Sequence, residues 1–190
     1  MSSMNDDSRL VKKALKGDRK AFEMIILRYQ QPLVNYLGRM TGERETAHDF
    51  AQDVFLKAYA SLDSYRPPFK FSTWLFKIAS NHMIDHWRTK KIAAISLDQP
   101  CGAEDDSLRI QVEDHELSVA RKYELAELRI RIEKVLDRIP DGLRELFVLR
   151  HVNEFSYEEI ADIKGLPVGT VKNRVFQAKE MLRRQLEETS

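Results

Sequence analysis

A short turn near the C-terminus constrains the fold of this chain most strongly. Ser156 and Glu159 have the spacing of a capping box, in which two side chains bond the first free amides of a helix. Gly165 is typical of the left-handed residue that ends a helix, and Pro167 cannot continue that helix but can precede another. The sequence therefore predicts two helices joined by a tight turn, the second over about residues 168–186.

The second helix is expected to have two different faces. From Val171 to Leu186 apolar residues follow at steps of three and four, which marks a buried stripe. Phe176 lies off that stripe, and between Lys164 and Arg184 six basic residues stand against one acidic residue. A charged face in water is the alternative, but an exposed aromatic favours DNA reading, where rings contact thymine methyls and amides bond base edges. The predicted reading side chains are Lys172, Asn173, Phe176 and Gln177.

The whole chain is expected to be all-α. Of its 190 residues, almost all outside one acidic segment have helical periodicity, and no run alternates as a strand would. We expect two small helical domains, independent in isolation, joined by a flexible acidic linker, with the helix-turn-helix in the second. The predicted limits are 1–93, 94–117 and 118–190. The expected helices cover about 7–16, 19–40 (where Pro32 would kink or divide it), 43–62, 72–91 (capped by Ser72), 117–138 and 141–152, before the C-terminal pair.

Composition points to a cytoplasmic protein without membrane insertion. Cys101 is the one cysteine, so no disulfide can form within the chain, and its presence is interpreted as incidental. No N-terminal run resembles a signal peptide, and no apolar stretch is long enough to span a bilayer. The net charge of +1 conceals an acidic segment, residues 104–118, between two basic regions.

The front domain contains an aromatic and basic segment. Between residues 69 and 76 four aromatics occur, and Lys77, Asn81 and Arg88 fall on one helical face. Rings interleaved with cations suit single-stranded nucleic acid, because bases stack on rings and phosphates meet lysines. At least two of the rings Trp74, Phe76 and Trp87 are expected in the core. The preceding loop residues are harder to explain as core: Phe69, Lys70 and Phe71.

Two further patterns leave alternatives open. His82, Asp85 and His86 could bind a metal, but two helical histidines without an obvious third ligand are weak evidence. The acidic side of the helix at 43–62 could face solvent or dock a basic partner.

Four segments in order, 45–59, 71–81, 140–150 and 156–174, resemble the extracytoplasmic-function group of the sigma-70 family. The resemblance covers about residues 8–187 apart from the linker. It implies a non-catalytic specificity subunit of bacterial RNA polymerase, without cofactor or metal, regulated by an anti-sigma factor that clamps both domains. The linker resembles the segment that threads toward the polymerase active site.

The resemblance also implies roles for individual residues. The helix at 43–62 would dock on the clamp coiled coil of core polymerase through Asp49, Gln52 and Asp53, although His48 replaces the usual acid before them. The melted −10 element would meet Phe69, Lys70, Phe71, Lys77, Asn81 and Arg88, with Asn81 near the flipped base. The duplex −35 element would meet the four reading side chains, with Thr170 and Arg174 on phosphates. Gln177 stands where many relatives carry arginine, which suggests an altered contact.

Two rivals remain at this point. A free-standing transcription regulator with the same helix-turn-helix would bind promoter duplex without polymerase. A helical metal-dependent hydrolase would use His82, Asp85 and His86.

Overall fold

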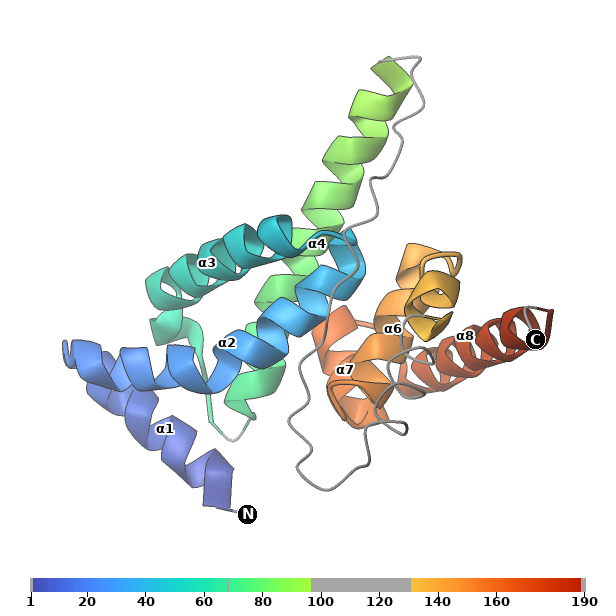
Figure 1. Cartoon of the computed structure of the whole chain (residues 1–190). Coiled ribbons are helices and arrows are strands. Elements are labelled where there is room, and N and C mark those ends of the chain that lie inside the picture. The colour runs from blue at the N-terminus through green and yellow to red at the C-terminus, as the bar shows by residue number, and fades with distance from the viewer. Residues whose placement is uncertain (1, 68, 97–130, 189–190) are drawn as a thin grey trace, which may run out of the picture.

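The structure, a computed structural model, describes residues 2–67, 69–96 and 131–188. Within these ranges every regular element is helical, which confirms the all-α class (Figure 1). The predicted linker, from residue 97 on, and Cys101 lie outside the described residues. The front half contains α1 (Ser2–Ala14), α2 (Arg19–Thr41), α3 (Arg44–Ala60), the 3₁₀ turn η1 (Leu62–Ser64) and α4 (Phe71–Ser96). The second half contains a helical stretch at 131–136, then α6 (Asp141–His151), α7 (Tyr157–Lys164) and α8 (Val168–Glu188).

Helix α2 is the central element of the front half. Asp18 caps its first turn by accepting from the Ala21 amide, and Gly42, at φ 75°, ends it in the left-handed conformation. The helix remains continuous through Pro32, so the predicted division does not occur. One face of α2 packs against α3, which buries five apolar side chains: Ala47, Ala51, Val54, Phe55 and Ala58.

The C-terminal half forms the predicted helix-turn-helix. Ser156 accepts from the Glu159 amide, while the Glu159 carboxylate accepts from the Ser156 amide at 2.8 Å, so both bonds of the capping box are present. Gly165 ends α7 at φ 63°. On α8 the predicted stripe is buried at Val171, Val175 and Ala178, and it is half-buried at Leu182 and Leu186.

The two halves pack against each other rather than standing as the independent pair that the linker suggested. Figure 1 shows α7 beside α4, and the rings of Phe76 and Phe155 meet edge to face at 4.9 Å. Buried apolar side chains from both halves form one continuous core. Burial of this apolar surface outweighs the freedom that the linker would allow.

A buried polar network lies in the same contact region between the two halves, which we call the seam. Glu145 of α6 is fully buried, and its carboxylate accepts from the Tyr36 hydroxyl at 2.8 Å and from the Lys164 ammonium at 2.6 Å. Lys164 also donates to the Ser80 hydroxyl of α4 at 2.8 Å. Burial, and then the Glu145 charge, raise the pKa of the Tyr36 hydroxyl well above its ordinary value, so Tyr36 remains a donor. Every charge in this network is therefore bonded, as burial requires.

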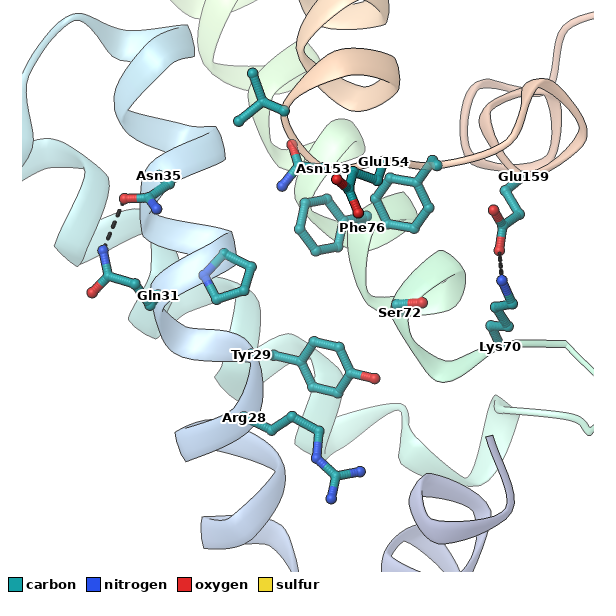
Figure 2. A pocket seen from close by; sticks show the side chains of 13 residues that line it. Arg28, Tyr29, Gln31, Asn35, Lys70, Ser72, Phe76, Asn153, Glu154 and Glu159 are labelled. Carbon is teal, nitrogen blue, oxygen red and sulfur yellow. Dashed lines mark hydrogen bonds and ion pairs between the residues drawn. The ribbon is translucent and has the colours of Figure 1, made fainter. Parts of the chain in front are cut away.

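The edge of the seam contains a cavity. This cavity has a volume of about 500 Å³. Its lining residues come from α2, the start of α4, the loop after α6 and Glu159 of α7 (Figure 2). Lys70 reaches across it to the Glu159 carboxylate, with Nζ and Oε1 2.7 Å apart. Glu154, on the loop that lines the cavity, has φ 60°, a conformation that non-glycine residues rarely adopt.

Removal of the Glu145 carboxylate should be strongly destabilising, because it leaves the Lys164 charge buried without a counter-ion. We expect Glu145→Ala to lower the free energy of unfolding by about 3–5 kcal/mol, measured by urea denaturation. Glu187→Ala is the matched control, since it removes a carboxylate from an exposed pair with Arg183 and should cost about 0.5 kcal/mol or less. Equal losses in the two variants would contradict the importance of the network.

Candidate nucleic-acid and polymerase interfaces

The exposed face of α8 carries the side chains predicted to read duplex DNA. Phe176 is 62% exposed, although the neighbouring Val175 is buried. Lys172, Asn173, Arg174 and Gln177 are exposed, and Thr170, in the first turn, is half-buried. Helix α8 therefore presents an aromatic ring, two amides and two cations to solvent together.

The surroundings of α8 are electropositive. Partial burial, followed by the charges of Arg150 and Lys179, lowers the pKa of the His151 imidazole below its ordinary value. Burial is the largest cause of this shift, and the two neighbouring cations add a positive local potential to it. Such a potential favours the approach of phosphates.

A second candidate surface runs along α4. Lys77, Asn81 and Arg88 are exposed on the predicted face, and Arg88 pairs with Asp85. Ile84, which is 42% exposed, lies on the same stripe and was missed by the sequence analysis. Its position three residues after Asn81 and four before Arg88 is the signal that could have identified it. An exposed apolar side chain amid polar ones suits contact with an unstacked base.

The two phenylalanines at the start of the aromatic and basic segment differ in exposure, although both were predicted to contact DNA. Phe69 is 59% exposed, but Phe71 is only 1% exposed, so it cannot stack on bases and its predicted role is wrong. Phe71 is the first residue of α4, and its ring contacts those of Tyr29, Tyr65 and Trp74 at 5.3–5.5 Å.

The other predicted features of this aromatic segment are the Ser72 cap and the burial of its remaining rings. Ser72 does not cap α4, because the helix begins one residue earlier and the Lys70 carbonyl accepts from the Trp74 amide. Phe76 is fully buried, while Trp74 and Trp87 are partly buried against the core, in line with the expectation that at least two of these rings belong to the core.

The outer face of α3 is the candidate polymerase contact. Asp49, Gln52 and Asp53 are all exposed, as docking requires. One turn further, Leu56 and Tyr59 are 68% and 50% exposed, which the sequence analysis did not single out. They border a groove of about 610 Å³ between α2 and α3, lined also by Phe22, Ile26 and His48.

The two histidines considered as metal ligands have packing roles. Both imidazoles meet the Phe50 ring edge to face, at 4.6 Å for His82 and 4.9 Å for His86. The Lys57 ammonium lies 2.7 Å from the His82 Nδ1 atom. Because an ammonium can only donate, this ring nitrogen is the acceptor. No group of three or more potential metal ligands occurs among the described residues.

Comparison with known proteins identifies the family. The family model "Sigma-70 region 2" matches residues 25–92, and "Sigma-70, region 4" matches residues 129–182. Relatives match nearly the full length. The chain is 30% identical to the RNA polymerase sigma-H factor of Pseudomonas aeruginosa, over 98% of this chain and 97% of the relative. The chain belongs to the sigma-70 family.

Two further relatives confirm the resemblance to the extracytoplasmic-function (ECF) group. The ECF RNA polymerase sigma factor SigW of Bacillus subtilis is 35% identical over 93% of this sigma factor and 94% of its own length. The ECF RNA polymerase sigma-E factor of Escherichia coli strain K12 is 33% identical over 96% of this chain and 95% of its own.

Solved structures resemble the arrangement of both halves. CnrH in complex with the cytosolic domain of CnrY superimposes with a TM-score of 0.70 and 26% identity, over 97% of this chain and 99% of CnrH. The sigma factor RpoE of Bartonella quintana, in complex with the anti-sigma factor NepR, gives a TM-score of 0.70 and 26% identity over 88% and 98%. In the part of this sigma factor that the structure describes, no helix has the length and apolarity needed to cross a membrane.

The environment of His82 predicts a pH dependence of stability. Burial, and then the Lys57 charge, lower the pKa of His82 from its ordinary 6.5. The unfolded chain therefore binds this proton at higher pH than the folded chain. Stability is full above about pH 6.5 and is lost as the pH falls through that value toward the lower folded pKa.

We expect the free energy of unfolding to fall between about pH 7.5 and pH 5.5, and to fall less in His82→Gln. His48→Gln, a histidine outside the Phe50 cluster, is the control. Urea denaturation at both pH values measures the difference. Identical pH dependence in His82→Gln and the wild type would show that His82 is not a source of this effect.

Proposed function

We propose that this sigma factor directs RNA polymerase to promoters by reading two DNA elements with two separate surfaces. The observation that carries the proposal is Phe176, 62% exposed among cationic and amide side chains on a helix whose opposite stripe is buried. A face exposed merely to solvent gains nothing from phenylalanine, whereas a groove-reading face gains contact with thymine methyls.

The exposed face of α8 is proposed to read the duplex −35 element. Lys172, Asn173, Phe176 and Gln177 would contact base edges, because they project from the solvent side of the second helix of a helix-turn-helix. Thr170 and Arg174 would contact phosphates on either side. The cations Arg150 and Lys179 near His151, together with the basic residues of α8, support this orientation of α8 toward DNA.

The stripe on α4 is proposed to hold the melted −10 element. Lys77, Asn81 and Arg88 supply polar contacts, and Ile84 with the exposed Phe69 supplies apolar surface for unstacked bases. Phe71 would not touch DNA; it would support this surface from the core, where its ring packs against Tyr65 and Trp74. The free energy of single-strand binding would offset the cost of melting, so the chain makes and breaks no covalent bond.

The outer face of α3 is proposed to dock on core polymerase. Asp49, Gln52 and Asp53 supply acidic and amide contacts, and the adjacent exposed Leu56 and Tyr59 extend them with apolar surface. A polar rim beside an apolar patch is the usual composition of a protein interface.

An anti-sigma factor is proposed to hold the two halves in their packed arrangement. In this arrangement Lys70 is paired with the Glu159 carboxylate, which competes with a DNA phosphate for its ammonium. The two solved relatives with TM-scores of 0.70 are both complexes, one of them with an anti-sigma factor. A partner that spans the seam would keep Lys70 occupied, and its release would free the front surface for DNA.

Reconstituted transcription tests the proposal. Core polymerase with the wild-type chain should start transcription at a defined set of genomic sites, and mapped start points should share two upstream elements. Tight binding of duplex by the chain alone, with no transcription at any site when core polymerase is added, would favour the free-standing regulator instead.

Two substitutions on α8 should have different effects. Gln177→Ala should change the preferred base at one −35 position, at a cost of about 1–3 kcal/mol for the preferred sequence. Arg174→Ala, one turn away, should weaken binding to all sequences equally and reduce the salt dependence. Binding of the holoenzyme to a library of −35 variants measures both. A uniform loss in Gln177→Ala would make that residue a phosphate contact.

A further inference from the structure

Tyr157 lies between two cations that come from different helices. It is the first residue of α7, and its ring is half-buried against the core. The Arg150 guanidinium, from the last turn of α6, lies 4.7 Å from the ring centroid. The Lys172 ammonium, from α8, lies 5.6 Å from the same centroid. One ring thus connects α6, α7 and α8.

The two cations are held in different ways. Arg150 also donates to the Phe155 carbonyl at 2.9 Å, so both this hydrogen bond and the Tyr157 ring hold its guanidinium in place. Lys172 has an exposed side chain, and within the described residues no carboxylate forms an ion pair with it. Two acids of the same helix, Glu180 and Glu187, pair with Arg183 instead. The ring of Tyr157 is therefore the contact that limits where the Lys172 ammonium can lie.

A ring and a carboxylate restrain a lysine with different consequences. A carboxylate would neutralise the charge and compete with DNA for the ammonium. The ring attracts the ammonium through its quadrupole and leaves the full charge available. A lysine side chain held in advance also loses less conformational freedom when it binds its target. The Tyr157 contact thus restrains Lys172 without masking it.

We propose that Tyr157 is a positioning residue for DNA reading, which holds the Lys172 ammonium in place for its contact with a base edge of the −35 duplex. This inference rests on the proposed function, because it assigns Tyr157 a role through Lys172. Tyr157 itself need not touch DNA. Its substitution should therefore matter only while Lys172 is present.

The test compares three chains within the holoenzyme, wild type, Tyr157→Phe and Tyr157→Leu. The probe is a labelled duplex carrying the −35 sequence that wild-type holoenzyme selects from a randomised pool. Tyr157→Phe keeps the ring and should bind as the wild type does. Tyr157→Leu keeps apolar volume but removes the ring, and should lose about two- to fivefold in affinity. It should also lose preference at the base position that Lys172→Ala relaxes.

A double-mutant comparison separates positioning from a structural role. In a Lys172→Ala background, Tyr157→Leu should cost nothing further, whereas in an Arg150→Ala background its loss should persist. Equal losses from Tyr157→Leu with and without Lys172 would overturn the positioning role, even if melting temperatures are unchanged. If Lys172→Ala itself leaves base preference unaltered, both this inference and the assignment of Lys172 in the proposed function fail.

Discussion

The buried carboxylate of Glu145 is the constraint on which the arrangement of this sigma factor depends. A fully buried charge is tolerated only where donors surround it, and here they come from both halves, Tyr36 from α2 and Lys164 from α7. Replacing such a network by apolar groups is often neutral for stability, so its importance lies in fixing one register of the two halves. Apolar packing of Phe76 on Phe155 supplies surface burial, but this packing alone would not select that register.

The seam is nevertheless built so that it can open. Glu145 and Lys164 belong to the same half, so their ion pair persists when the halves separate. The front half contributes neutral hydroxyls, those of Tyr36 and Ser80, whose bonds water can replace. No charge is left buried without a partner on separation. The principal cost of opening is therefore exposure of apolar surface, which a polymerase or a DNA strand can cover again.

Sequence reasoning succeeded where local chemistry decides the outcome. The capping box at Ser156 and the left-handed Gly165 are determined by a few neighbouring residues, and the structure has both. The buried stripe of α8 follows from spacing alone. Sequence reasoning failed where contacts between distant parts of the chain determine the structure. Phe71 was expected in a loop because it precedes the predicted helix, but its ring packs against Tyr29 of α2, Tyr65 just after η1 and Trp74 of α4. The packing of the halves depends on pairs such as Tyr36 and Glu145, which lie 109 residues apart and share no local pattern.

Helix α7 links the seam to the DNA-reading surface, and Glu159 shows how the two can be separated. One carboxylate oxygen accepts from the Ser156 amide and completes the cap, while the other pairs with Lys70 across the seam. Burial alone would raise the pKa of this carboxyl, but bonds from Lys70 and Ser156 outweigh it and lower the pKa below its ordinary value. The Lys70 side chain is 55% exposed, and pairs of that kind contribute little to stability. Loss of Lys70 to a DNA phosphate would therefore leave the cap intact, so α7 could continue to support Tyr157 and α8 while the front half moves away.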